Sequence, residues 1–361
     1  MDANPEKLQA FTGKMALDIG AAMSAALVVL GDRLGLYKAL AKAGPSTSAE
    51  LAALTGTVER NVREWLAAQA ASGYVDYDAT AGTFSLNPEQ AMVFADEGGP
   101  AFMAGGFELI SAAFQDEAKV AAAFKSGKGM GWHEHCPCLF SGTERFFRPG
   151  YNANLVSSWI PALDGVEDQL QAGISVADVG CGHGASTILM AKAYPNSRFT
   201  GFDYHGPSIA RARQLAEAEG VAGRARFETA SAKDFAQASG AQASGGEGYG
   251  LVTIFDALHD MGDPVGAARH IRSRLAPDGT FMLVEPMAGD TLEENLNPVG
   301  RIFYAASALI CTPASQSQEV GLGLGAQAGE ARLRQVATDA GFTQFRRAAA
   351  TPFNMVLELR A

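Results

Sequence analysis

The stretch Val176-Ala177-Asp178-Val179-Gly180-Cys181-Gly182-His183-Gly184 decides the fold of the second half of this chain. An apolar strand runs directly into three glycines, each separated from the next by one residue, and a helical segment follows. Glycine is needed where a backbone turns tightly and lets a ligand approach without a Cβ atom in the way. The stretch therefore predicts a strand, a ligand-binding turn and a helix, which together begin an α/β sheet.

The same alternation continues on both sides of this motif. From about residue 160 onward, short apolar segments alternate with amphipathic helices, which is typical of a doubly wound sheet. We predict strands at Val176–Val179, Arg198–Phe202, Ala225–Thr229, Leu251–Phe255 and Thr280–Glu285, and a terminal pair near Phe342–Arg347 and Asn354–Leu359. The low-complexity stretch 238–250 predicts a surface loop.

The first hundred residues follow a different pattern. Residues 15–43 predict two helices, Thr47-Ser48-Ala49-Glu50 forms a capping box that opens a third, and Val58–Ser72 predicts a fourth. Tyr74–Asp78 and Thr83–Leu86 then alternate like the strands of a hairpin. Helix, helix and hairpin in that order indicate a mainly helical, winged-helix-like domain.

Charge argues against the DNA-binding role that a winged helix usually suggests. Residues 1–100 contain 7 Lys and Arg against 12 Asp and Glu. In the segment that would read DNA, Arg60 and Arg63 are offset by Glu59 and Glu64. A DNA-contacting face must be basic. We therefore interpret this domain as a dimerisation and substrate-capping module, and we do not expect nucleic acid as a partner.

Length and composition set the domain plan and the compartment. For 361 residues we predict a winged-helix-like domain at 1–96, a helical connector with a lid loop at 97–150, and a ligand-binding domain at 151–361, within which 290–325 is a lid or dimer insertion. The net charge of −11 and four cysteines without disulfide-framework spacing favour a cytoplasmic protein.

The N-terminal helices suggest self-association. The apolar run Ile19–Leu30 is too short to cross a bilayer and is flanked by Asp18 and Asp32, and no secretory signal precedes it. We expect no membrane partner. Since the helices before residue 44 are apolar on several faces, we expect them to bury against a second copy in a homodimer.

An acidic residue supports a nucleotide-type ligand at the glycine turn. Asp203 ends the next strand, 23 residues past Gly180, where a carboxylate can accept hydrogen bonds from two ribose hydroxyls. A dinucleotide site is the natural competitor. The spacing G-x-G-x-G rather than G-x-G-x-x-G, and the absence of a second nucleotide-binding half, weigh against it.

With these motifs in order, residues 145–361 resemble a class I S-adenosylmethionine-dependent methyltransferase. The whole chain resembles bacterial two-domain methyltransferases with a winged-helix N-terminus, relatives of small-molecule O-methyltransferases. The resemblance implies a Rossmann-like, mostly parallel sheet with an antiparallel last strand, S-adenosyl-L-methionine as cofactor and a small-molecule acceptor. It places cofactor contacts at Asp178, Gly180, Cys181, Gly182, Gly184, Asp203, Tyr204, Ser231, Ala232, Asp256, Ala257 and Tyr151.

A histidine after the fourth strand is the candidate general base. His259 lies in Ala257-Leu258-His259-Asp260-Met261-Gly262-Asp263, which resembles the His-Asp-Trp-Ser-Asp motif of O-methyltransferases. A neutral histidine can accept a proton from a phenol or enol as its oxygen attacks. Asp260 completes the motif, and Glu285 matches a family glutamate that orients the base. The alternative is a structural histidine in a loop after a strand.

The polar loop Gly131–Cys138 has two interpretations. His133, His135, Cys136 and Cys138 could ligate zinc, but structural zinc sites usually join two separated knuckles and no second knuckle follows. We assign no metal and prefer a lid in which Trp132, His133 and His135 contact substrate. Arg148 and Tyr151 belong to a segment that resembles one near the cofactor in relatives, and Arg148 is a substrate-binding candidate.

Two rival functions remain open from the sequence. A winged-helix transcriptional regulator could use a methyltransferase-like domain as a ligand sensor, although the acidic balance opposes it. An interaction protein could retain a vestigial cofactor fold, although the intact glycines and Asp203 oppose that. We favour a small-molecule methyltransferase with an oxygen acceptor.

Overall fold

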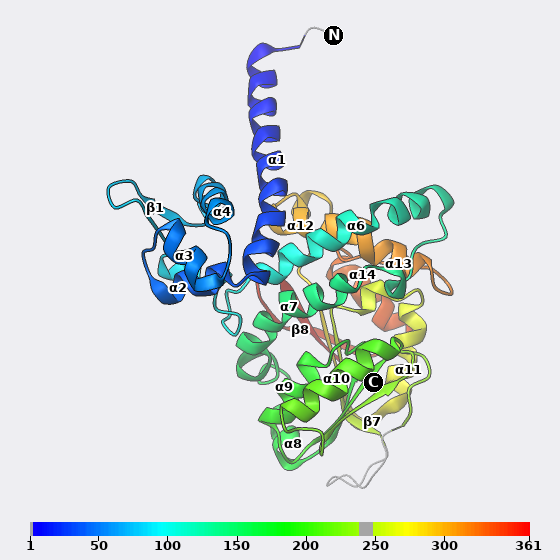
Figure 1. Ribbon diagram of the computed structural model, residues 1–361. Coiled ribbons are helices and arrows are strands. Elements are labelled where there is room, and N and C mark those ends of the chain that lie inside the picture. The colour runs from blue at the N-terminus through cyan, green and yellow to red at the C-terminus, as the bar shows by residue number, and fades with distance from the viewer. Residues whose placement is uncertain (1–2, 238–247) are drawn as a thin grey trace. The chain divides into compact units, whose positions relative to one another are not determined.

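The computed structural model describes residues 3–237 and 248–361, which form two compact units (Figure 1). The first unit contains the residues up to Phe114 together with Pro137–Gly150, and the second contains Gln115–Cys136 and Tyr151–Ala361. The connector expected at 97–150 is thus divided between the units instead of standing between them. The loop predicted at 238–250 falls outside the described residues, except for its last three positions.

The first unit is a winged helix extended by long helices. Its elements are α1 (Pro5–Arg33), α2 (Leu36–Ala43), α3 (Ser48–Thr55), α4 (Glu59–Ala71), β1 (Asp76–Asp78), β2 (Thr83–Ser85), α5 (Pro88–Phe94), α6 (Ala104–Ser126) and α7 (Pro137–Asn154). The last residues of α6 and α7 belong to the second unit. Thr47 and Glu50 form the predicted capping box, and β1 pairs antiparallel with β2 as the wing. Leu36, Tyr37, Leu51 and Leu66 are among the side chains that fill its core. The winged-helix prediction is confirmed.

Helix α1 differs from the expectation. The two predicted helices are present, but α1 begins at Pro5 and continues to Arg33. The apolar run Ile19–Leu30 is thus part of a longer helix, which among the described residues is the one long and apolar enough to cross a membrane by length and composition. Most of its apolar length is exposed, including Leu8, Ile19 and Met23.

The second unit is built on a seven-stranded sheet in the order β5-β4-β3-β6-β7-β9-β8. Its strands are β3 (Ser175–Val179), β4 (Arg198–Asp203), β5 (Ala225–Thr229), β6 (Tyr249–Phe255), β7 (Leu275–Pro286), β8 (Gln344–Ala350) and β9 (Asn354–Arg360). β9 pairs antiparallel with both β7 and β8, and the five strands from β5 to β7 pair in parallel. The predicted mostly parallel sheet with an antiparallel last strand is confirmed.

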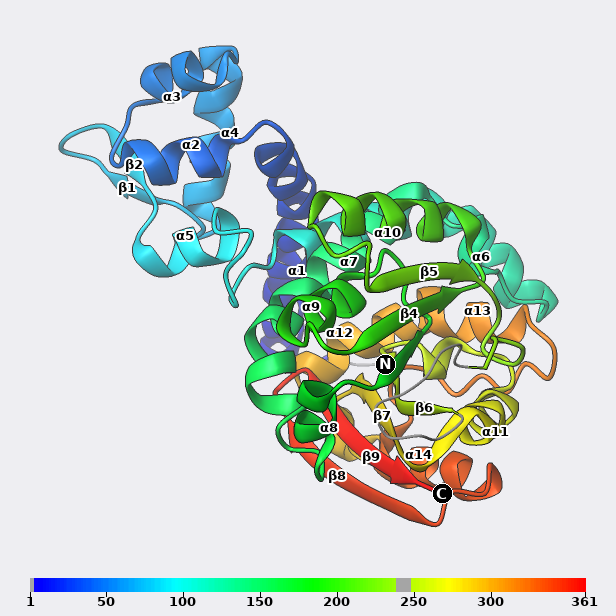
Figure 2. The same ribbon diagram turned by 90° about the horizontal axis from the view of Figure 1, so that it is seen from below.

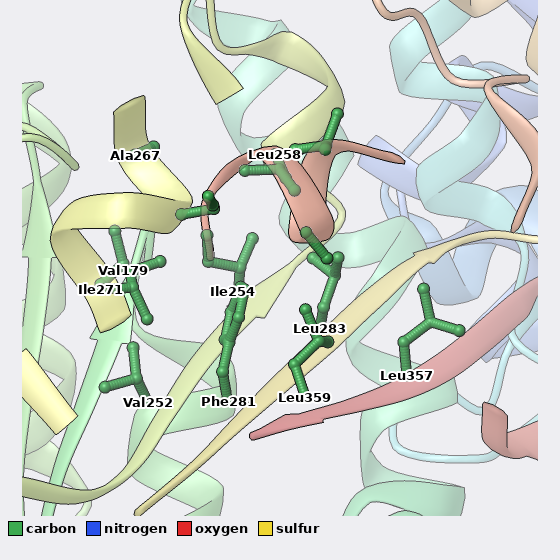
Figure 3. Packing of buried hydrophobic residues seen from close by; sticks show 14 of the residues in the cluster. Val179, Val252, Ile254, Leu258, Ala267, Ile271, Phe281, Leu283, Leu357 and Leu359 are labelled. Atoms are coloured by element: carbon green, nitrogen blue, oxygen red, sulfur yellow. The ribbon is translucent and has the colours of Figure 1, made fainter. Parts of the chain in front are cut away.

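Helices cover both faces of this sheet (Figure 2). The helices of the second unit are η1 (Trp132–Glu134), η2 (Leu155–Trp159), α8 (Val166–Ala172), α9 (Ala185–Ala193), α10 (Gly206–Ala218), η3 (Leu258–Asp260), α11 (Pro264–Arg274), η4 (Glu293–Asn295), α12 (Pro298–Ala306), η5 (Ser307–Cys311), α13 (Thr312–Gln316) and α14 (Gly329–Asp339). Ile271 of α11 belongs to one buried cluster with Ile254 of β6, Leu283 of β7 and Leu357 of β9 (Figure 3). Leu333 and Val336 of α14 belong to the same cluster. Helices α9 and α10 contact β4 and β5. Burial on both faces explains the near-continuous apolar strands of the sequence.

Candidate functional site

The site lies at the carboxyl ends of β3, β4 and β6. β3 is followed in the chain by β4 on one side of it, whereas β6 lies on its other side. The carboxyl end of β3 is therefore a topological switch point, where open α/β sheets form a crevice between the loops. The two loops meet at their bases, because a Cβ atom on Gly180 would lie 3.0 Å from the Cβ of Ala257. Ligands of open α/β sheets bind at such switch points.

The glycine loop has the backbone that its sequence requires. Gly180 has a φ of 74° and Gly184 a φ of 80°, in the left-handed region that side chains rarely adopt. Gly184 also has no room for a side chain, since a Cβ atom there would lie 2.6 Å from the Phe227 ring. The loop therefore presents bare backbone to the crevice. Substitution at either position would strain it.

Asp203 is tied to this loop. One carboxylate oxygen accepts a hydrogen bond from the Gly182 N–H at 3.0 Å, and the other accepts one from the His205 N–H at 2.8 Å. Burial raises the pKa of Asp203, against the effect of these two hydrogen bonds. Each oxygen keeps a second lone pair for a ligand hydroxyl. The acid predicted from the strand end thus lies directly beside the glycine turn.

Asp178, in contrast, is buried, and its carboxylate accepts hydrogen bonds from side chains of the fold itself. Its carboxylate accepts hydrogen bonds from the hydroxyls of Ser186 (2.7 Å), Thr187 (2.5 Å) and Thr253 (2.9 Å). These contacts join β3 to the first turn of α9 and to β6. We therefore assign Asp178 to holding the glycine loop in place, in preference to the direct cofactor contact expected from the resemblance.

Four further cofactor candidates follow the carboxyl ends of β3, β4 and β5. Cys181 is buried within the loop, whereas Tyr204, next to Asp203, is 49% exposed. Ser231 and Ala232 follow β5 and are half-buried. The Ser231 hydroxyl accepts a hydrogen bond from the Lys233 N–H at 3.2 Å, which shapes the turn beyond β5. All four thus follow strands, as predicted, and their cofactor contacts stay a prediction.

His259 is held by a glutamate, as the family motif implied. Its Nδ1 donates to Glu285 Oε2 at 2.5 Å, and the other Glu285 oxygen accepts from the Leu258 N–H at 3.0 Å. The Nε2 atom lies 3.3 Å from Asp260 Oδ1. All three side chains are buried. With Nδ1 held by Glu285, Nε2 faces Asp260.

The charge state of His259 differs from our expectation. Burial alone would lower the pKa of His259, but the carboxylates of Glu285 and Asp260 outweigh it and raise that pKa well above its ordinary value. We expected a neutral imidazole, and the site instead favours the protonated form. Two flanking carboxylates in a low-dielectric interior account for the difference.

The predicted lid segment contacts Asp260, next to His259, through its tryptophan. Trp132 Nε1 donates to Asp260 Oδ2 at 2.9 Å, a contact within the second unit. His133 is exposed, and its ring packs edge-on against Tyr204 with the centroids 6.4 Å apart. His135 is buried, and its Nδ1 lies 3.1 Å from Asp116. Trp132 and His133 therefore border the site, whereas His135 anchors the segment.

Arg148 belongs to the first unit, and its contacts there are ion pairs. Its guanidinium pairs with Glu97 at 3.2 Å and with Glu144 at 3.1 Å. The same unit contains Arg145, which pairs with Asp32 and Glu108. Both arginines belong to an ion-pair network of this unit, which explains Arg148 without a substrate.

A second polar group beneath the crevice was only partly anticipated. Asp256 adopts a φ of 50°, uncommon for a residue with a side chain, and accepts hydrogen bonds from Tyr151 Oη at 3.0 Å and Asn354 Nδ2 at 2.7 Å. Burial and the neighbouring Glu285 raise the pKa of Asp256 to about 8. The sequence named Tyr151 and Asp256 but not Asn354, which comes from a strand almost a hundred residues later.

Comparisons with known proteins agree with this fold. Residues 170–323 match a family model described as a methyltransferase domain, and residues 22–95 match one described as an Rv2258c-like winged HTH domain. The chain therefore contains a methyltransferase domain behind a winged helix-turn-helix domain.

Individual relatives are distant. Trans-aconitate 2-methyltransferase of Streptomyces coelicolor is 38% identical over 60 residues, which is 17% of this chain and 20% of that protein. The chain spans about a fifth of the length of the curated relatives it matches. The structure of mitomycin 7-O-methyltransferase MmcR aligns with a TM-score of 0.67, at 20% identity, over 99% of this chain and 100% of that one. Human N-acetylserotonin methyltransferase in complex with SAM aligns with a TM-score of 0.69, at 16% identity, over 100% and 99%. These structures share the fold.

Proposed function

We propose that this protein transfers a methyl group from S-adenosylmethionine to an oxygen atom of a small molecule. The observation that supports this most is the position of the Glu285–His259 pair. His259 follows the carboxyl end of β6, the strand whose exit loop meets the glycine loop of β3, and Glu285 lies at the carboxyl end of the neighbouring β7. This position supports a role for His259 beside the bound cofactor, with Nε2 turning from Asp260 to the acceptor.

The residues present fit this cofactor. The bare backbone of Gly180–Gly184 would accept its amino-acid part, and Asp203, already oriented by the Gly182 and His205 N–H groups, would accept hydrogen bonds from the ribose hydroxyls. Ser231 and Ala232 would border the adenine. When bound, the cofactor supplies an activated methyl group on a positively charged sulfur.

The protein itself would align the acceptor and take one proton from it. Glu285 fixes the ring of His259, so that Nε2, once the imidazolium has released its proton to solvent, accepts the hydroxyl proton as the oxygen is methylated. Glu285 and Asp260 stabilise the imidazolium that this step forms. Trp132, held on Asp260, would cover the acceptor and exclude water.

The acceptor atom is tested by a product screen. The full chain is incubated with cofactor labelled in its methyl group and with a panel of phenols, enols, thiols and amines, and products are identified by mass spectrometry. We expect label on oxygen of a hydroxylated compound. Transfer confined to thiols or amines would show that the oxygen assignment is wrong, while leaving methyl transfer intact.

The rival regulator is less well supported. On α4, the helix that would read DNA, Arg60 pairs with Glu64 at 2.6 Å and Arg63 pairs with Glu59 at 2.7 Å. The two cations of this helix are therefore balanced by carboxylates of the same helix. This arrangement lacks the basic face that phosphate contacts need.

We also propose that α1 forms a homodimer interface in a cytoplasmic protein. Leu8, Phe11, Ile19 and Met23 are exposed at spacings of three, four and eight residues, which places them along one side of the helix. A water-exposed apolar stripe of this length favours burial against a partner.

Charge on this stripe should separate the subunits. Replacing both Ile19 and Met23 by glutamate is expected to convert a dimer into a monomer at micromolar concentration in analytical ultracentrifugation. The interface would otherwise bury negative charges that have no cation beside them. Ala10→Glu is the matched control, since Ala10 is exposed about two and a half turns before Ile19, on the opposite side of the helix. A wild-type chain that sediments as a monomer, or that requires lipid to stay in solution, would contradict the homodimer.

A further inference from the structure

A buried cysteine completes a group of three ligands beside the base. Cys311 ends η5, and its Sγ, an imidazole nitrogen of His259 and a carboxylate oxygen of Asp260 all lie within 4.8 Å of one another. All three residues are buried. Methyl transfer as proposed above gives Cys311 no task. A thiol, an imidazole and a carboxylate converging in the interior are the donor types of a zinc site.

The two ligands on η3 are already oriented by outer hydrogen bonds. His259 donates through Nδ1 to Glu285, which directs Nε2 toward the cluster. Asp260 accepts from Trp132 through Oδ2, which directs Oδ1 toward the cluster. A carboxylate behind a ligating histidine and a hydrogen bond behind a ligating carboxylate are usual supports of metal sites.

The carboxylate ligand faces the same space as the other two. Asp260 is 7% exposed, and its Oδ1 pairs at 3.3 Å with Nε2 of the protonated His259. The Cys311 thiol interacts with both side chains. A zinc ion would replace the proton that now joins the same donor atoms.

We propose that His259, Asp260 and Cys311 bind a zinc ion, with the fourth position open. Two ligands of one tetrahedral zinc lie roughly 3.3–3.8 Å apart, since zinc–ligand bonds are about 2.0–2.3 Å. The histidine–aspartate separation already meets this value, and small side-chain rotations would bring Cys311 in. The thiol selects zinc over magnesium or calcium, which prefer oxygen. Binding replaces the proton on Nε2 and releases the thiol proton to solvent.

Zinc and the proton of the acceptor would compete for one atom, Nε2 of His259. Zinc on Nε2 would occupy the lone pair that the proposed reaction uses, so zinc should inhibit methyl transfer. This consequence rests on the proposed function, whereas zinc binding itself does not.

Cobalt and zinc titrations of the full chain test the binding. The protein is stripped with a chelator and kept in a non-thiol reductant, then titrated with Co²⁺ and back-titrated with Zn²⁺. We expect one ion per chain, visible absorption of tetrahedral cobalt, and a thiolate-to-cobalt band that zinc abolishes. Cys311→Ala should remove the thiolate band and weaken zinc binding by at least about 100-fold, more than loss of an outer hydrogen bond costs.

Two further variants test which side chains bind the metal. Asp260→Asn should weaken zinc binding with the thiolate band retained, which covers the case that Cys311→Ala fails to fold. The double variant Cys136→Ser/Cys138→Ser should bind cobalt like the wild type. Loss of the band in that double variant, or no band in the wild type, would overturn the proposal.

Activity separates this inference from the proposed function. Zinc should inhibit methyl transfer by the wild type, and Cys311→Ala should need at least about 100-fold more zinc for the same fractional inhibition relative to its own zinc-free rate. A chain that binds cobalt through Cys311 but transfers no methyl group would retain the zinc site and refute the methyltransferase proposal.

Discussion

Replacing Asp203 by alanine should lower the affinity for S-adenosylhomocysteine by about 10²–10⁴-fold. Two hydrogen bonds from ribose hydroxyls to a carboxylate are worth about 1.5–3 kcal/mol each. The variant also removes the acceptor for the Gly182 and His205 N–H groups, which adds to the loss. Isothermal titration calorimetry of the full-length variant measures the effect.

A neighbouring acid provides the control for Asp203. Glu228 lies on β5, pairs in register with Phe202 of β4 and is exposed. Glu228→Ala should leave the affinity unchanged within a factor of about two, as for most surface substitutions. If Asp203→Ala binds S-adenosylhomocysteine as tightly as the wild type, then the ribose lies elsewhere and the cofactor site is misplaced.

His259→Gln should lower the turnover number for an oxygen acceptor by about 10²–10⁴-fold, the usual contribution of a general base. Glutamine can still fill the space beside Glu285, but it cannot hold the proton of the hydroxyl. Cofactor affinity should be unchanged, because the proposed cofactor contacts lie in the loops after β3 and β4. Steady-state kinetics with the acceptor from the product screen, combined with calorimetry, separates the two quantities.

Two further variants serve as comparisons for the turnover of His259→Gln. Glu285→Gln should cause a smaller loss than His259→Gln, because it weakens the orientation of the imidazole but leaves the base in place. His270→Gln should have no effect on turnover, since His270 lies on α11 against the Phe235 carbonyl. A His259→Gln enzyme with nearly wild-type turnover would mean that the histidine is structural and that alignment alone accounts for catalysis.

Most of the fold was predictable from local pattern. Each strand of the large sheet was anticipated to within a few residues, because strands buried on both faces read as continuous apolar runs between glycines and charged helices. The wing and the capping box at Thr47 were equally local signals. The true extent of α1 was missed because residues 5–14 are polar and mixed, and only the continuous helical backbone joins them to the apolar run.

The site was predictable where motif and strand end coincide, and not where distant segments meet. The glycine loop, Asp203 and the His259–Glu285 pair each follow a recognisable strand. The sequence around Asp178 does not indicate that three hydroxyls donate hydrogen bonds to its carboxylate. Arg148 looked available in sequence, but its partner Glu97 is about fifty residues away. Cys311 lies a similar distance from His259, so no ligand spacing revealed the cluster.

The most direct test of the central claim is a pair of calorimetric titrations of the full-length protein, one with S-adenosylhomocysteine and one with NAD. We predict that S-adenosylhomocysteine binds once per chain, with contacts that Asp203→Ala weakens, and that NAD produces no binding heat. Saturable NAD binding at the glycine loop, or no binding of S-adenosylhomocysteine, would contradict the assignment of this crevice to a methyl donor.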